Sequence, residues 1–292
     1  MNAIEIKNLT KYYGKNRGII DLSLEVNNGD FYGFIGPNGA GKSTTIRLLL
    51  GLLNPSSGEA KLLGLNTKNQ STEILKKVGY LPSDAAFYKG MRVKEILKLS
   101  SDLRGIDCRQ EAEILCKRLE LDVNKKIEEL SLGNRKKVGI VCALQHKPEL
   151  YILDEPTSGL DPLIQHEFYT ILQERNLEGA TIFLSSHVLS EVARYCKNAA
   201  IIRDGKLLVA DSVSNLSQSD IKRVTLKGLK GTIQTKNIKN LKTEDGVTNF
   251  LYAGKAEALI KELATYQFDD VTITDPDLEE SFIHYYKKEV EQ

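Results

Sequence analysis

The sequence predicts an α/β protein with a parallel sheet at its core, an antiparallel β subdomain, a helical subdomain and a small C-terminal α+β extension. The parallel sheet is predicted from dense apolar runs at 30–36, 149–156 and 180–187, because strands buried on both faces are apolar throughout. Stretches with helical periodicity separate these runs, as in proteins whose strands alternate with helices. Segments 2–10 and 22–26 instead alternate apolar and polar residues, which is typical of a half-exposed antiparallel sheet.

The first dense run ends in a glycine-rich loop. A helix is expected from Lys42 onward, because the apolar residues that follow recur at helical spacing. A mostly helical insert, at about 84–145, separates this part from the later strands. The segment 199–211 is expected to form a strand hairpin with Asp204-Gly205 at its turn. All these elements belong to the first predicted domain, residues 1–211.

A change of composition after the hairpin predicts a domain boundary. Segment 212–219 is polar and rich in serine, as linkers are, and residues 220–292 form a C-terminal accessory domain. Strands in that domain are joined by a helix at 255–266, whose apolar face is expected to include Ile260. A final helix is expected after Asp275-Pro276, because an acid followed by proline favours a helix start.

Composition and charge argue against several classes of protein. The apolar fraction is 41% and the charged fraction 27%, as in ordinary globular domains. A net charge of +1 gives no electrostatic argument for binding nucleic acid or an anionic membrane. No apolar run approaches the roughly 18 residues that span a bilayer, and the N-terminus lacks the apolar core of a signal peptide. We therefore expect a soluble, cytoplasmic chain, and another polypeptide must supply any membrane part of its function.

Residues 36–44, GPNGAGKST, have the full spacing of a phosphate-binding loop, Gly-x-x-x-x-Gly-Lys-Ser. Glycines let the backbone N–H groups point at phosphate oxygens, and the N-terminus of the following helix adds partial positive charge. Lys42 is expected to reach the β- and γ-phosphates, and Ser43 to give its hydroxyl to Mg²⁺. The complete pattern disfavours a plain glycine turn, and the loop lacks the G-x-G-x-x-G spacing of a dinucleotide site. The nucleotide-binding residues predicted in the loop are Gly36, Pro37, Asn38, Gly39, Ala40, Gly41, Lys42, Ser43 and Thr44.

A pair of acids ends the second dense run. Asp154 is expected at the carboxyl end of a buried strand, the edge of a parallel sheet at which ligands bind. Glu155, the next residue, is positioned to take a proton from an attacking water. Two acids at a strand end are common in isolation. With a phosphate loop on the same chain, we expect Asp154 to bind the metal and Glu155 to act as general base.

Further segments resemble motifs of the ATP-binding-cassette (ABC) ATPases. ELSLGNRKK at 129–137 is similar to the signature motif of that family, usually Leu-Ser-Gly-Gly-Gln, and its place ahead of the acid pair strengthens the match. Its Ser131 is also a good N-cap for the helix that follows. LTKYYG at 9–14 resembles the aromatic loop, SGLDP at 158–162 the D-loop, and LSSHVLSE the switch-histidine segment.

The resemblance covers residues 1 to about 211 and implies an ATP-hydrolysing cassette of the P-loop NTPase class. Members of the family face each other head to tail and sandwich two ATP molecules, so each phosphate loop is capped by the signature of the opposite chain. In these roles Tyr13 stacks on adenine, and His187 contacts the γ-phosphate and holds the attacking water with Glu155. The other implied site residues are Ser131, Gly133 and Asn134 for the trans ATP contact, Asp161 in the D-loop, and Ser43 with Asp154 for Mg²⁺.

The implied partners are a second cassette and a separately encoded membrane permease of the drug, antibiotic and peptide exporter type. A homodimer is the preferred form of the cassette pair, and a heterodimer with a different cassette is the alternative. The chain would then lie on the cytoplasmic face of the membrane through the permease. DLEESFIHYY at 277–286 loosely resembles the C-terminal extension of that exporter type. The alternative is a soluble regulatory or assembly ABC ATPase without a permease. A small-molecule P-loop kinase is disfavoured, because it leaves the signature segment unexplained.

Two motifs depart from the family pattern. Ser83 stands where the Q-loop of the family has glutamine, and its side chain is too short to reach Mg²⁺ and water as the amide does. Either its hydroxyl acts through a bridging water, or the contact is lost and hydrolysis is slower. Ser83→Gln is therefore expected to change the ATPase rate or the coupling of hydrolysis to transport. In the signature, Leu132 replaces the first glycine and Asn134 the glutamine. We expect these replacements to weaken the trans contact without removing it.

Overall fold

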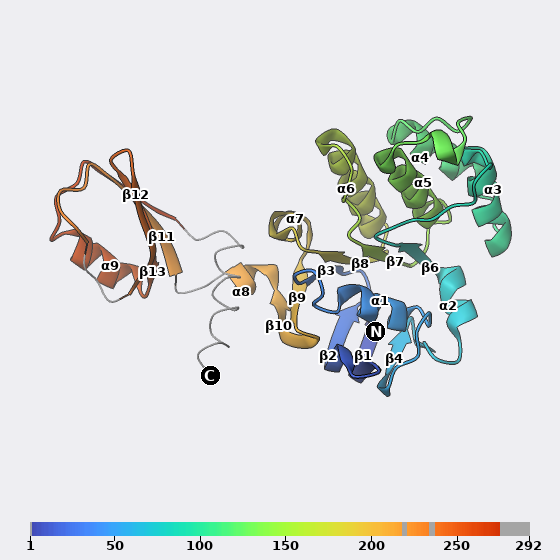
Figure 1. The fold of residues 1–292 in the computed structure, drawn as a ribbon, viewed down its shortest axis with the longest axis horizontal. Coiled ribbons are helices and arrows are strands. Elements are labelled where there is room, and N and C mark those ends of the chain that lie inside the picture. Colours follow the sequence, from blue (N-terminus) through green and yellow to red (C-terminus); the bar gives the residue numbers. More distant parts are fainter. Residues whose placement is uncertain (1, 218–220, 234–236, 275–292) are drawn as a thin grey trace. The chain divides into compact units, whose positions relative to one another are not determined.

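The structure is a computed structural model of the chain, and it describes residues 2–217, 221–233 and 237–274. The chain divides into two compact units, Met1–Ala210 and Asp211–Gln292, each with its own core (Figure 1). The first is built around two sheets and the second around one. The helix expected after Asp275-Pro276 and the segment 277–286 lie outside the described residues.

The first unit is built on a six-stranded sheet in the order β10-β9-β3-β8-β7-β6. All pairings from β6 to β9 are parallel, as the dense apolar runs predict. Every residue of the three central strands is buried. Asp204-Gly205 forms the turn between β9 and β10, as expected for a hairpin. The strands are β3 (Phe31–Ile35), β6 (Val78–Leu81), β7 (Leu150–Asp154), β8 (Thr181–Ser186), β9 (Asn198–Arg203) and β10 (Lys206–Ser212).

A second, antiparallel sheet of the first unit has the order β2-β1-β4-β5. Helix α1 (Lys42–Leu49) contacts β2 and β4 of this sheet and β7 of the other, so it lies between the two sheets (Figure 1). Ile46 of α1 shares one buried cluster with Leu22 and Ile152, one from each sheet. Burial of the apolar face of α1 therefore fixes the start of the helix, where the phosphate loop ends. The strands are β1 (Asn2–Tyr13), β2 (Asn16–Asn27), β4 (Ser57–Leu62) and β5 (Leu65–Asn66).

The predicted helical insert consists of helices that group beyond β6 (Figure 1). Helix α5 packs directly on β6, and Gly79 of β6 allows this close approach. A Cβ at that position would lie only 2.3 Å from the carbonyl oxygen of Ala143. The helices of the insert are α3 (Val93–Arg104), α4 (Arg109–Arg118), the short 3₁₀ helix η1 (Ile127–Glu129) and α5 (Leu132–Leu144). The other helices of the unit are α2 (Ser71–Lys77), α6 (Pro162–Leu177) and α7 (Leu189–Tyr195). Of the helices in the described part of the chain, none is both long and apolar enough to cross a membrane.

The second unit contains an antiparallel sheet in the order β12-β13-β11-β14. Leu259 and Leu263 of α9 pack against this sheet in one buried cluster. The prediction that Ile260 shares the buried face is wrong, since its side chain is 57% exposed and the contact stripe of α9 is narrow. The segment 212–219, predicted as a linker, includes the short helix α8. The elements are α8 (Val213–Ser217), β11 (Ile221–Lys227), β12 (Ile238–Glu244), β13 (Val247–Ala253), α9 (Ala256–Leu263) and β14 (Asp270–Thr274).

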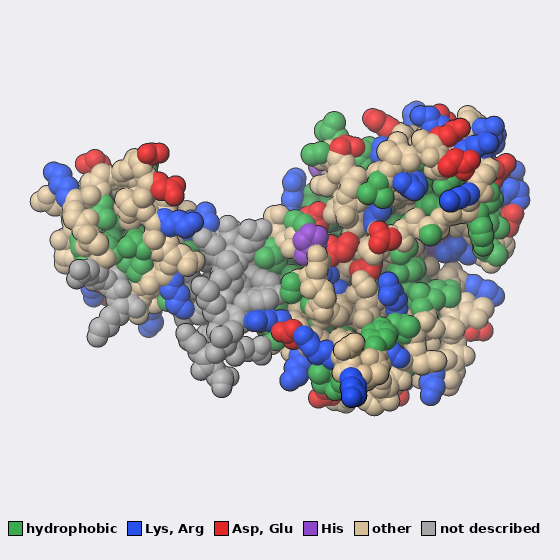
Figure 2. All heavy atoms as spheres, viewed as in Figure 1, with side chains coloured by type: hydrophobic (Ala, Val, Ile, Leu, Met, Phe, Trp, Pro, Cys, Tyr) green, Lys and Arg blue, Asp and Glu red, His purple; other side chains and the backbone are tan. Residues whose placement is uncertain are grey.

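Charged side chains of both signs are interspersed on the face of the molecule that Figure 2 displays. This distribution agrees with the net charge of +1.

Candidate active site

The phosphate loop connects β3 to α1, and its glycines allow close packing. Gly41 has a φ of 108°, and a Cβ there would lie 2.8 Å from a methyl group of Ile19. At Gly36 a Cβ would lie 2.5 Å from the carbonyl oxygen of Ile202 in β9. No other residue fits at either position without moving the strands. The neighbouring strands therefore hold the loop in its curled shape.

The end of this loop is suited to an anion. The first-turn N–H groups of α1 have no acceptor within the helix, and the helix N-terminus carries partial positive charge. Gly41, at the N-cap, has no side chain to satisfy them. The Lys42 side chain is only 6% exposed, and its Nζ donates to the carbonyl oxygens of Gly36 at 2.6 Å and Pro37 at 3.3 Å. Backbone donors and a buried cation at one place fit a polyphosphate.

Glu155 lies at the centre of an ion-pair network beside the loop. One carboxylate oxygen, Oε1, lies 3.0 Å from the Nζ of Lys42. The other, Oε2, accepts a hydrogen bond of 2.7 Å from Nδ1 of His187. The Glu155 side chain is 16% exposed and that of His187 52% exposed. The pair therefore faces the solvent at the carboxyl ends of β7 and β8. The structure thus brings together residues that were predicted from three separate motifs.

The backbone of Glu155 adopts an unusual conformation. Its φ is 48°, in the left-handed region that residues other than glycine rarely occupy. Such a conformation costs about 1–3 kcal/mol and persists only where the surroundings fix it. Here the N–H of Glu155 donates to both the carbonyl oxygen and Oγ of Ser185, each at 3.2 Å. Its carbonyl oxygen accepts a hydrogen bond of 3.0 Å from Lys136.

Asp154 and Ser43 supply the oxygen atoms expected for a magnesium site. Asp154 ends β7 and is 1% exposed, and its Oδ1 accepts a hydrogen bond of 2.6 Å from Oγ of Ser185. Its other oxygen makes no hydrogen bond within the part of the chain that the structure describes. Mg²⁺ prefers carboxylate, hydroxyl and phosphate oxygens, so the free oxygen of Asp154 and the hydroxyl of Ser43 fit that ion.

Ser185 was not predicted from the sequence, yet its hydroxyl contacts both members of the acid pair. Ser185→Ala removes a donor from Asp154 and an acceptor from the N–H of Glu155. We expect kcat for ATP to fall about tenfold, and the free energy of unfolding to fall by about 1–2 kcal/mol. Steady-state turnover and thermal unfolding measure the two effects, with the exposed Ser57→Ala as control. A Ser185→Ala protein with unchanged kcat would show that the hydroxyl plays no part in positioning the acids.

Tyr13 lies at the end of β1, beside the start of α1. Its hydroxyl is 3.5 Å from Oγ1 of Thr44, and Nζ of Lys11 lies 5.5 Å from the centre of its ring. The Tyr13 side chain is 43% exposed. A partly exposed aromatic face next to the phosphate loop can stack on a flat base.

The signature and D-loop segments adjoin each other. Oγ of Ser131 accepts a hydrogen bond of 3.3 Å from the N–H of Asn134 and so caps α5. A Cβ on Gly133 would lie 2.8 Å from the carbonyl oxygen of Gly159 in the D-loop. Asp161 caps α6 by accepting a bond of 3.1 Å from the N–H of its third residue. Among the described residues, no hydrogen bond or ion pair joins Ser131 to the phosphate loop of its own chain.

Lys136 is a second residue that the sequence analysis missed. It lies in α5 and is 5% exposed, and its Nζ donates to the carbonyl oxygens of Pro82, Ser83 and Glu155. Burial lowers its pKa to about 8, although the nearby carboxylates of Asp154, Asp84 and Glu155 act in the opposite direction. In a run of basic residues such a lysine looks solvent-exposed. Its helical spacing of four from the buried Ile140 was the available signal.

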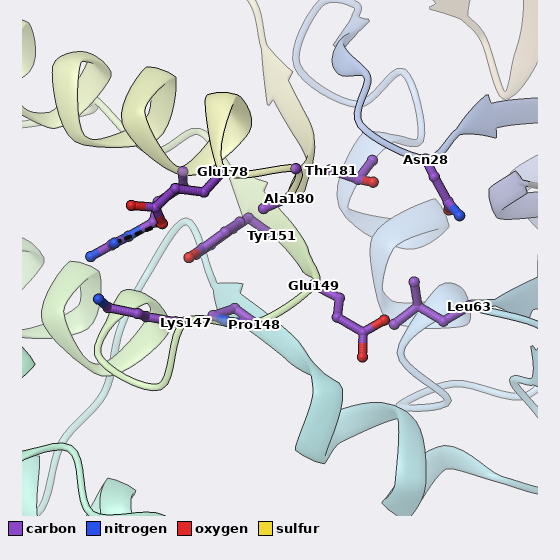
Figure 3. A pocket seen from close by; sticks show the side chains of 11 residues that line it. Asn28, Leu63, Lys147, Pro148, Glu149, Tyr151, Glu178, Ala180 and Thr181 are labelled. Atoms are coloured by element: carbon purple, nitrogen blue, oxygen red, sulfur yellow. Dashed lines mark hydrogen bonds and ion pairs between the residues drawn. The ribbon is translucent and has the colours of Figure 1, made fainter.

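Hollows elsewhere in the first unit lie away from the phosphate loop. One of about 290 Å³ is lined by residues that include Glu149, Tyr151 and Thr181 (Figure 3). These residues lie at the amino ends of β7 and β8, whereas Asp154 lies at the carboxyl end. Another hollow, of about 950 Å³, lies between α3 and α4. The acid pair therefore lies at the carboxyl ends of the strands, away from the pocket at their amino ends.

Comparisons with known proteins show the family to which the chain belongs. The family model described as ABC transporter matches residues 19–158. The bacitracin transport ATP-binding protein BcrA of Bacillus licheniformis is 39% identical over 211 residues, which are 70% of this chain and 68% of that protein. The chain belongs to the ABC transporter ATP-binding proteins. This ABC ATPase hydrolyses ATP with the help of Mg²⁺.

Solved structures show the same ABC fold. The ATP-binding subunit of an ABC transporter superposes with a TM-score of 0.70 at 31% identity, covering 74% of this chain and 92% of that one. A dimeric bacterial ABC transporter cassette superposes with a TM-score of 0.64 at 25% identity, covering 72% and 98%. The predicted fold class, a P-loop ABC cassette, is confirmed.

Proposed function

We propose that this ABC ATPase closes as a homodimer around two ATP molecules and drives a separately encoded membrane permease in the direction of export. The observation that carries the ATPase part is the contact of Glu155 with both Lys42 and His187 at the end of the phosphate loop. A dimer is supported by the dimeric cassette of similar fold. Export of a drug or antibiotic is supported by the likeness to BcrA, which is named for bacitracin transport.

In this proposal the residues of the site position the reactants and neutralise charge. ATP would supply the phosphoryl group that is transferred to water, and Ser43 and Asp154 would hold Mg²⁺, which would offset its negative charge. Glu155 accepts the proton of the attacking water. His187 orients the Glu155 carboxylate through Nδ1 and presents its other ring nitrogen to the γ-phosphate. Lys42 exchanges Glu155 for phosphate oxygens on binding, which frees the carboxylate to contact water.

The helical insert and the segment around Ser83 are the proposed docking region for a cytoplasmic helix of the permease. The hollow between α3 and α4 belongs to this insert, and apolar side chains such as Leu97, Ile106 and Val123 line it between charged ones. Through this contact the chain would lie on the cytoplasmic face of the membrane. Residues 220–292 are proposed as a C-terminal accessory domain.

Purification from detergent-solubilised membranes tests the permease. The tagged Glu155→Gln protein, with ATP and Mg²⁺, is expected to retain nucleotide and stay closed, and therefore to carry a protein with several membrane spans through the purification. Lys42→Met, treated in the same way, is the control for nucleotide-dependent recovery. Recovery of a soluble ATP-dependent dimer alone would contradict the permease and favour a regulatory or assembly ATPase.

A further inference from the structure

One buried ammonium joins three parts of the ABC cassette. Lys136 lies in α5, five residues after the signature residue Ser131. Its Nζ donates to the carbonyl oxygens of Ser83 at 2.9 Å, Glu155 at 3.0 Å and Pro82 at 3.2 Å. Three acceptors use all three N–H groups of a lysine ammonium. The signature helix, the segment at the Q-loop position and the proposed general base therefore meet at a single atom.

These bonds are costly to break. The Lys136 side chain is 5% exposed, and a buried charge is tolerated only where hydrogen bonds and opposite charges compensate for lost hydration. Removing the ammonium would leave three main-chain carbonyls without this donor. A polar group that loses its hydrogen-bond donor on folding destabilises the protein. The three segments are consequently held as one unit as long as Lys136 is in place.

The bond to Glu155 fixes a strained residue. With a φ of 48°, Glu155 needs its peptide groups held on both sides. Ser185 holds the N–H, and the carbonyl oxygen accepts from Lys136 at 3.0 Å and, at the longer distance of 3.4 Å, from the N–H of Ser158. The direction of the carboxylate toward Lys42 and His187 follows from this backbone conformation. Loss of the Lys136 bond leaves only the long bond from Ser158 on this carbonyl, so the peptide can rotate toward an unstrained conformation, which moves the carboxylate.

We propose that Lys136 is a positioning residue for Glu155, in addition to Ser185, and that it links this base to the Pro82–Ser83 segment through main-chain carbonyls instead of the Ser83 side chain. The inference rests on the proposed role of Glu155 as general base. The hydroxyl of Ser83 makes no hydrogen bond within the described part of the chain, whereas its carbonyl does. Every residue has a main-chain carbonyl, so this link does not depend on the side chain at position 83. It can therefore form with a serine at the position where the family pattern has glutamine.

Lys136→Met tests the link, because methionine has similar length and no N–H donor. We expect kcat to fall roughly ten- to hundredfold, as small misplacements of a reacting group do. KM for ATP should stay unchanged, since the phosphate loop is intact. Ser83→Ala retains the carbonyl, so its kcat should fall less than that of Lys136→Met. Lys76→Met, at an exposed lysine of α2, is the matched control.

The outcomes separate the parts of the inference. A Lys136→Met protein with wild-type kcat would overturn it, as would a rise in KM with kcat unchanged. A Ser83→Ala protein as slow as Lys136→Met would show that the side chain carries the link, against the proposal. Retained turnover in Glu155→Gln would refute the base itself, which is a different result from an unaffected Lys136→Met.

Folding of the variants is checked by thermal unfolding with and without ATP, where stabilisation by ATP reports an intact phosphate loop. If Lys136→Met does not fold, Lys136→Gln serves instead, because its amide keeps two N–H donors at a shorter reach. Its kcat is expected to lie below that of the wild type with KM unchanged. Glutamine is shorter than lysine and has two N–H donors instead of three. A wild-type kcat in Lys136→Gln would therefore overturn the proposal.

Discussion

Glu155→Gln is expected to lower kcat for ATP hydrolysis by about a hundredfold to ten-thousandfold, the usual contribution of a general base. The amide has the size of the carboxylate and can still contact Lys42 and His187, so the site keeps its shape. It cannot accept a proton from water at neutral pH. ATP affinity should be unchanged or higher, because Lys42 no longer has to leave an anionic partner 3.0 Å away.

Single-turnover hydrolysis and equilibrium ATP binding, measured on the same preparation, check the two parts of this prediction. ATP and Mg²⁺ should also convert the variant to a stable dimer in size-exclusion chromatography, since slow hydrolysis leaves the nucleotide in place. Glu73→Gln, at an exposed acid of α2, controls for the change of charge. Turnover within a fewfold of the wild type would mean that another group accepts the proton.

The parts of the fold that the sequence predicts are those with a local signal. The strands β3, β7 and β8 are buried at every residue, so their sequences are apolar throughout and easy to recognise. The strand β12 was missed, because it is exposed along nearly its whole length and shows no alternation. It is a strand because β13 supplies its hydrogen-bonding partner, and no local pattern encodes that pairing.

The residues of the candidate site also fall into two groups, those with a local signal in the sequence and those without one. Motif residues such as Lys42, Glu155 and His187 could be predicted, because the chemistry demands particular side chains at particular spacings. The contacts of Lys136 could not, because its acceptors are main-chain carbonyls in segments far apart in the sequence. Every residue has a main-chain carbonyl, so the sequence does not indicate which carbonyl accepts a hydrogen bond. Nor does it distinguish the lysine that donates to that carbonyl from any other basic residue.

Lys42→Met is expected to lower ATP affinity about a hundredfold, equivalent to about 2.8 kcal/mol. Lys42 is the buried cation of the phosphate loop, and methionine keeps its length without the charge or the donors. The change also leaves Oε1 of Glu155, now 3.0 Å from the Lys42 ammonium, without a counter-charge. We therefore expect the nucleotide-free protein to lose stability as well, by an amount that unfolding in denaturant can measure.

The double variant Lys42→Met/Glu155→Gln separates the two roles of Lys42. Because glutamine removes the uncompensated charge, stability should recover in part, with a coupling energy of about 0.5–3 kcal/mol between the two positions. ATP affinity should stay low, since the cation is still missing. Lys76→Met is again the control for loss of a lysine. Equal stability in the single and double variants would show that Lys42 and Glu155 do not pair in solution. Tight ATP binding by Lys42→Met would instead place the nucleotide somewhere other than the phosphate loop.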